Sequence, residues 1–158
     1  MGANLTVFIV KGPKKFTKIA IKKAEKAAAE VIDAAKMYAS RQLDAERNDP
    51  NCDRGEVFKN LYEDPRLKGR IDENDYTDPV DFIDQFSELD PKKEVAEFVQ
   101  LWVTSDMRDM TSREDPDDRK QYIVVAGELS WGDEPDGWGY QSLKRAFQLG
   151  ITQALGIR

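Results

Sequence analysis

The sequence predicts an α+β protein in the order β-α-(helical insertion)-β-β-α, with a small antiparallel sheet and helices packed on one of its faces. Two short runs rich in β-branched and aromatic residues, Leu5–Lys11 and Tyr122–Leu129, predict strands. A stretch of Ala, Lys and Glu without Gly or Pro, from Lys14 to about Glu46, predicts a long helix between them. With 158 residues and no low-complexity linker, residues 1–158 are expected to form one domain.

The predicted first strand ends at a Gly12-Pro13 turn, and the helix after it carries a narrow stripe of small apolar residues. The stripe alternates steps of four and three residues, as one face of a helix does: Ala20, Ala24, Ala27, Val31, Ala34 and Tyr38. About 30 helical residues extend roughly 45 Å, more than a compact domain of this size needs. We therefore expect the stripe to pack on the sheet, and the far end of the helix to bend, fray or pair with another segment.

Residues 48–90 are divided by Asp-Pro pairs and are interpreted as an insertion of short helices and turns packed on the sheet. An Asp at the N-cap accepts from free backbone amides, and the Pro after it lacks a donor that would be unsatisfied anyway. Val57–Tyr62 and Val80–Phe86 are the candidate helices. Asp49–Gly55 places oxygens at alternate positions, as a calcium loop does, but its glycine falls one place late and its twelfth position is Asn60. A polar turn is therefore preferred.

The C-terminal third contains one ambiguous segment, residues 92–105. Val95, Phe98, Val99 and Trp102 fit one helical face, yet Phe98–Thr104 is also rich in β-branched and aromatic residues. We predict a strand there, because Tyr122–Leu129 needs a partner, and Arg108–Lys120 then becomes a hairpin loop. Tyr140–Leu155 is predicted as an amphipathic helix with Leu143, Phe147, Ile151 and Leu155 spaced by four. The buried sheet is expected to contain Val7, Ile9, Val99, Leu101, Ile123 and Val125.

The chain contains no histidine and one cysteine, Cys52, which excludes several kinds of chemistry. Ser-His-Asp and Cys-His hydrolases need an imidazole base, and most catalytic zinc, copper and non-haem iron sites need imidazole ligands. One cysteine allows neither an internal disulfide nor a thiolate zinc cluster. No secretory signal is recognisable and no apolar run approaches the roughly 18 residues of a membrane span, so we expect a cytoplasmic protein without a cofactor.

Charge is unevenly distributed along the chain. Residues 1–42 carry nine Lys or Arg against three acids, a net charge of +6, whereas the remainder has a net charge of -12. A basic arm can bind an acidic partner or nucleic acid, but it can equally neutralise acids of its own chain. We favour the internal role and do not expect nucleic acid to be a partner, because the acidic remainder repels a polyanion.

The segment from Ser130 to Tyr140 is the most unusual in composition. It combines aromatic rings with carboxylates at a predicted strand-to-helix connection: Trp131, Asp133, Glu134, Asp136, Trp138 and Tyr140. Aromatic faces beside carboxylates suit a cationic group, such as an Arg or Lys of a partner protein. The alternative is that the tryptophans cap the core and the loop is only structural.

The sequence favours a non-catalytic binding or regulatory protein that recognises a partner protein through this aromatic-acidic loop. A second hypothesis is a magnesium-dependent phosphodiester or phosphoryl enzyme. Pro116-Asp117 followed by Glu128-Leu129-Ser130 has the spacing of a metal-dependent nuclease core, although Ser130 stands where the lysine is needed. A third hypothesis is an acidic mimic of nucleic acid that occupies a nucleic-acid-binding protein. The sequence does not indicate an oligomeric state.

Overall fold

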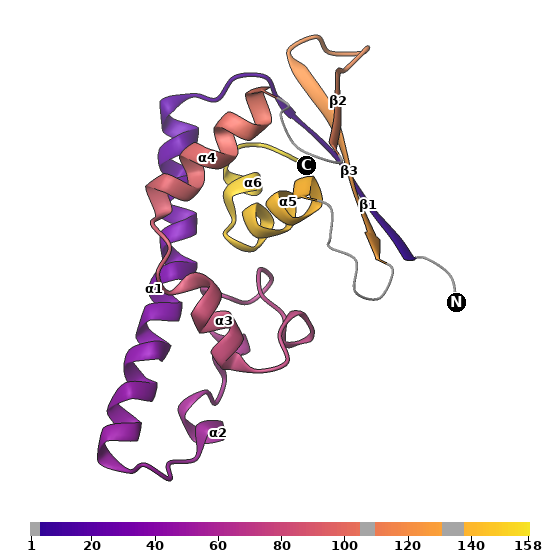
Figure 1. Ribbon diagram of the computed structural model, residues 1–158. Helices are drawn as coiled ribbons and strands as arrows, with labels where there is room; N and C mark the ends of the chain where they lie inside the picture. Colours follow the sequence, from indigo (N-terminus) through magenta and orange to yellow (C-terminus); the bar gives the residue numbers. More distant parts are fainter. Residues whose placement is uncertain (1–3, 105–109, 131–137) are drawn as a thin grey trace.

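The computed structural model describes residues 4–104, 110–130 and 138–158 and confirms an α+β fold with a three-stranded antiparallel sheet (Figure 1). β1 (Asn4–Pro13) and β2 (Met110–Glu114) both pair with the central β3 (Gln121–Ser130), which gives the order β1-β3-β2. β1 and β3 pair along their whole length, from Asn4 opposite Ser130 to Pro13 opposite Gln121. The helical elements lie between β1 and β2 and after β3, so the predicted order is confirmed.

The predicted strand at Phe98–Thr104 is wrong, because Pro91–Thr104 forms a helix, α4. Asp90 begins this helix by accepting a hydrogen bond from the backbone N–H of Lys92 at 3.0 Å, with Pro91 following it. Val95, Phe98 and Trp102, at helical spacing, are the buried side chains. Burial of this face outweighs the weak strand preference of the β-branched residues. The partner of β3 is β2, which comes from the charged stretch predicted to be loop.

The sheet buries the opposite set of side chains from the predicted set. Val124 and Ala126 of β3 are buried, and Phe8 and Val10 of β1 pack against the core. Of the residues expected in a buried sheet, Val7 and Ile9 are 46% and 68% exposed. Ile123 and Val125 are half-buried. Val99 and Leu101 are not in the sheet at all, because they belong to α4. Strand side chains alternate between faces, but this run is apolar at consecutive positions, so the sequence carried no signal for which set points inward.

The long helix is confirmed as α1 (Lys18–Asn48), which begins after Thr17, whose hydroxyl accepts from the backbone N–H of Ala20 at 3.1 Å. Its buried face follows the predicted stripe closely and consists of Ala24, Ala28, Val31, Ile32, Ala34, Ala35 and Tyr38. This face contacts α3 (Pro79–Phe86), α4 and α6 (Ile151–Ala154), so the stripe packs mainly on helices and the expected packing on the sheet is corrected. No helix within the described residues is both long enough and apolar enough to cross a membrane.

The insertion covers the far end of α1, and α1 continues as one helix beneath it (Figure 1). It contains α2 (Arg54–Val57), the 3-10 turns η1 (Leu61–Glu63) and η2 (Glu73–Asp75), and α3. The Tyr38 hydroxyl donates to Asp64 at 3.3 Å, which ties the insertion to the helix. At all five Asp-Pro pairs the Asp carboxylate accepts from the backbone N–H two residues later, as predicted for capping and turn positions.

The predicted C-terminal helix is divided into α5 (Trp138–Gln148) and α6 by Gly150, whose φ of 74° ends the first helix. Leu143, Ile151 and Leu155 are buried as expected, whereas Phe147 is 53% exposed. Phe147 lies before this break, in α5, and the buried residues Leu143, Ala146 and Leu149 recur every three positions along this stretch, so it falls outside the buried side of the helix. α5 contacts β3 and α6 contacts α1, so these helices lie between the sheet and α1 on one face of the sheet (Figure 1).

Candidate functional site

The described residues contain only two members of the predicted aromatic-acidic site. Trp138 is the first residue of α5, and Tyr140 is half-buried with its ring 5.0 Å from the ring of Phe8. Tyr140 therefore joins α5 to the sheet. Trp131, Asp133, Glu134 and Asp136 lie outside the described residues, as does any cluster that they form. The segment that carries them begins after Ser130, which pairs with Asn4 at the N-terminal end of β1.

An apolar face remains uncovered on the side of the sheet away from the helices. Val7 and Ile9 lie on this face, and Ile9 is directly opposite Val125 in the pairing of β1 with β3. Ile123 follows at the next position on the same face, opposite Lys11 on β1 and Arg113 on β2. We call Val7, Ile9, Ile123 and Val125 the outer apolar face. Because two strands contribute to it, it is a continuous patch with basic residues at one end.

β1 also has an unpaired backbone edge beside this patch. The Lys11 N–H donates to the Arg158 carbonyl at 2.8 Å, and the Arg158 N–H donates back at 2.9 Å, so the backbone of Lys11 points away from β3. Outward and inward backbone groups alternate along an antiparallel strand, so those of Val7 and Ile9 point outward too. Within the described residues these outward groups have no hydrogen-bond partner. This free edge is a template for strand addition.

Ion pairs link the basic arm to the acidic remainder at the other end of the sheet. Lys11 pairs with Asp115, and Lys14 pairs with Glu114. The Lys11 ammonium and the Asp117 backbone N–H hold the pKa of the Asp115 carboxyl below its ordinary value. Part of the positive charge of residues 1–42 is thus neutralised within the chain.

The carboxylates of the nuclease-like pattern are not brought together. Asp117 is exposed in the turn before β3. Glu128 lies seven residues along β3 from Gln121, the first residue of the strand, and at the rise of a β-strand these two residues are roughly 23 Å apart. In the calcium-like segment, Asp49 and Asp53 accept from the backbone N–H groups of Asn51 and Gly55. The described part of the chain contains no group of three or more acidic or cysteine side chains arranged to hold a metal ion.

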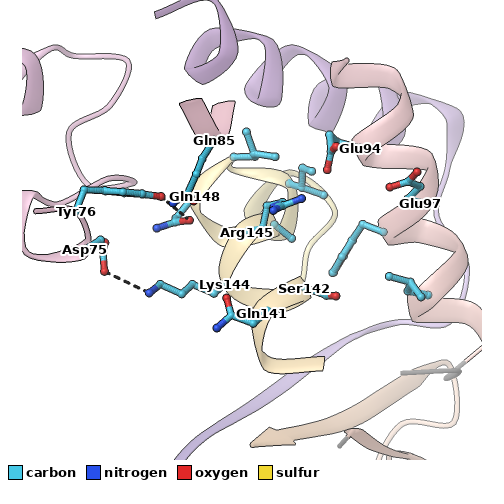
Figure 2. A pocket seen from close by; sticks show the side chains of 15 residues that line it. Asp75, Tyr76, Gln85, Glu94, Glu97, Gln141, Ser142, Lys144, Arg145 and Gln148 are labelled. Carbon is cyan, nitrogen blue, oxygen red and sulfur yellow. Dashed lines mark hydrogen bonds and ion pairs between the residues drawn. The ribbon is translucent and has the colours of Figure 1, made fainter. Parts of the chain in front are cut away.

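A polar pocket of about 490 Å³ lies between α4, α5 and the η2 turn (Figure 2). α5 contributes Gln141, Lys144, Arg145 and Gln148, which recur at helical spacing and therefore share one side of the helix. α4 contributes Glu94 and Glu97, one turn apart, and η2 contributes Asp75 with the neighbouring Tyr76. The walls between these groups include Phe98, Leu101, Leu149 and Ile151. We call this the polar pocket.

The electrostatics of the polar pocket leave several groups unmatched. Lys144 and Asp75 form an ion pair at 3.6 Å. Burial raises the pKa of the Glu94 carboxyl, while Arg145 acts in the opposite direction and Glu97 raises it further. Gln148 is 5% exposed, and its Oε1 accepts from the Tyr76 hydroxyl at 3.3 Å, but its Nε2 is buried without a hydrogen-bond partner. Burial also raises the pKa of Tyr76 to about 12, so this hydroxyl remains a donor.

Sequence reasoning missed the polar pocket, because its residues come from segments far apart in the sequence that only the folded chain brings together. One signal was present: Glu94 and Glu97 are spaced by three, as are Gln141 and Lys144, which places each pair on one side of a helix. Such pairs are common on exposed helices and do not indicate a pocket alone. Comparison with protein-family models, with curated proteins and with solved structures finds no match to this chain.

Proposed function

We propose that this chain is a non-catalytic cytoplasmic binding protein that recognises a partner protein by pairing an extended segment of the partner with the free edge of β1. The observation that carries the proposal is the coincidence of an unpaired backbone edge with exposed apolar side chains at Val7 and Ile9. In strand addition, backbone hydrogen bonds provide affinity and alternate side chains provide specificity.

The outer apolar face supports the same conclusion. Fully burying an aliphatic side chain stabilises a complex by about 1.5–3 kcal/mol, and Val7 and Ile9 keep 46% and 68% of their surface uncovered. A partner strand beside β1 would cover both residues and extend the sheet. An exposed apolar edge of this kind is otherwise an aggregation hazard, which gives a reason for it to be occupied in the cell.

The aromatic-acidic loop supplies the proposed specificity. It begins after Ser130, beside the same end of β1 that the partner strand would follow. We expect Trp131 or Trp138 to anchor the partner and Asp133, Glu134 and Asp136 to attract a Lys or Arg that flanks the added strand. The expected partner segment is therefore extended, apolar at alternate positions and basic at one end.

Photo-crosslinking from the strand edge tests this proposal. A photoreactive residue at position 7 should capture a discrete partner in a lysate of the source organism, and Ile9→Pro in the same chain should abolish capture. The N–H of Ile9 points outward, so proline removes no hydrogen bond of the β1–β3 pair and the fold should be retained. Trp138→Ala should also abolish capture, with little loss of stability.

The matched control is Ile19 on α1, which is 70% exposed and lies outside the sheet. A photoreactive residue at position 19 should capture no discrete partner, and Ile19→Lys should leave capture from position 7 unchanged. Capture that survives Ile9→Pro, or equal capture from both positions, would contradict strand addition. Capture of a second copy of this chain would also contradict the proposal of a partner protein, because it would show that the strand edge mediates self-association.

A further inference from the structure

We propose that the polar pocket binds a small organic cation that carries a hydrogen-bond acceptor at its other end. This site is separate from the proposed partner edge, since it lies between α4, α5 and η2 and includes no residue of β1 (Figure 2). The ligand class follows from three features: an unsatisfied buried donor, unpaired carboxylates and the net charge of the walls.

The unsatisfied donor is Nε2 of Gln148. Nearly all buried side-chain polar atoms in proteins have a partner, and leaving one without costs about as much as a lost hydrogen bond. Gln148 is held by the Tyr76 hydroxyl on its oxygen side, so its amide is oriented and cannot turn away freely. A ligand oxygen, from a carbonyl, a hydroxyl or a carboxylate, would satisfy the remaining N–H.

The unpaired carboxylates are Glu94 and Glu97. Within the described residues neither forms an ion pair, although Arg145 lies in the same pocket. Glu94 is half-buried, so its charge is poorly solvated, and Glu97 repels it from one helical turn away. A guanidinium or ammonium group placed between the two carboxylates would relieve both effects, and two carboxylates spaced along a helix suit the fork of a guanidinium.

The charges and size of the walls agree with such a ligand. The pocket is lined by three carboxylates and two cationic side chains, and the ion pair of Lys144 with Asp75 leaves Arg145 facing Glu94 and Glu97. One added positive charge balances the set. A volume of 490 Å³ lies within the range of small-ligand sites, and Phe98, Leu101 and Ile151 provide an apolar wall for a hydrocarbon stem.

Titration of the full chain with L-arginine, followed by amide chemical shifts, tests the proposal. L-Arginine has the cation, the stem and a carboxylate acceptor. We expect saturable shifts around α4 and α5 at millimolar concentration. Two analogues separate the two features: L-citrulline keeps the acceptor but has a neutral urea group, and n-butylguanidine keeps a single cation on a hydrocarbon stem but has no acceptor. Each should bind about tenfold more weakly or worse, because a charge-assisted hydrogen bond contributes at least that much.

Variants of the chain provide the second half of the test. Glu94→Gln should weaken L-arginine binding by about tenfold and reduce its preference over L-citrulline. Gln148→Met keeps the side-chain volume and removes the amide, so it should weaken L-arginine binding while leaving n-butylguanidine binding unchanged. Glu88→Gln, an exposed carboxylate outside the pocket, is the matched control and should change nothing. Absence of saturable shifts, equal binding of L-citrulline and L-arginine, or an equal effect of Glu88→Gln would each overturn the proposal.

Discussion

Asp64 offers a sharp test of how the insertion is held to the long helix. Its carboxylate accepts from the Arg66 backbone N–H at 2.9 Å, from Arg66 Nε at 3.0 Å and Nη2 at 2.8 Å, and from the Tyr38 hydroxyl at 3.3 Å. The Arg66 guanidinium is the largest cause that lowers the pKa of Asp64 from 3.8 to about 2. The Asp64 side chain is 9% exposed, so solvent screens these contacts little.

We expect Asp64→Asn to lower the free energy of unfolding at pH 7 by about 2 kcal/mol. A carboxyl pKa lowered from 3.8 to about 2 on folding corresponds to roughly that stabilisation of the ionised form. Asparagine keeps an oxygen that can accept from the Arg66 N–H, so the turn is retained and the loss reports mainly the charge. Urea denaturation of both proteins measures the difference directly.

The pH dependence of the difference in unfolding free energy can refute this explanation. Since the folded pKa of Asp64 is lowered, its contribution should be complete above about pH 4 and should disappear as the pH falls through about 2. The difference between the wild type and Asp64→Asn should therefore shrink over that interval. Glu63→Gln is the control, because its pair with Lys68 spans 3.9 Å with both side chains over 70% exposed and contributes about 0–1 kcal/mol. A difference that does not change with pH would refute the assignment of the stabilisation to the Asp64 charge.

Four further results are expected. Gly69→Ala should cost about 1–2 kcal/mol for its left-handed backbone alone, since φ is 83° and nothing lies within 4 Å of an added Cβ. Gly150→Ala should cost about 1 kcal/mol more, because its Cβ would meet Ala27 Cβ at 3.2 Å, and equal urea midpoints would contradict this steric account. Trp102→Phe should lower the free energy of unfolding by about 1–3 kcal/mol, because Nε1 donates to the Pro13 carbonyl at 2.7 Å in a buried site, and an unchanged urea midpoint would exclude that contribution. No sub-micromolar complex with DNA or RNA is expected at physiological salt in a fluorescence anisotropy titration, because the acidic remainder repels a polyanion and Lys11 and Lys14 are already paired.

Local chemistry was the part of the fold that the sequence predicted best. The Asp78-Pro79 pair predicted the start of α3, and the alanine stripe predicted the buried face of α1, because capping and helical periodicity depend on neighbouring residues. Packing partners depend on the whole chain. The stripe was expected on the sheet and packs mainly on α3, α4 and α6, since small residues allow close approach of any element.

The wrong predictions fall on segments whose local sequence preferences either conflict or do not distinguish between the alternatives. Phe98–Thr104 has strand-forming residues, but Asp90 and Pro91 start a helix that continues through it. In β1 both faces are apolar, so the inward set could not be identified, and the exposed Ile9 was expected to be buried. The aromatic-acidic loop stays a prediction, and the polar pocket required segments as distant as Asp75 and Lys144 to meet.

The pairing of β1 with β3 has a consequence for synthesis of the chain on the ribosome. Lys11 pairs with Ile123, so β1 has no strand partner until 112 further residues have been translated. At 5–20 residues per second this interval lasts about 6–22 s, much longer than the microseconds in which α1 can form. The nascent chain would therefore present an unpaired apolar strand ahead of a helix that is already folded. We expect that strand to be protected, by a chaperone or by contact with α1, while the C-terminal third is still being made.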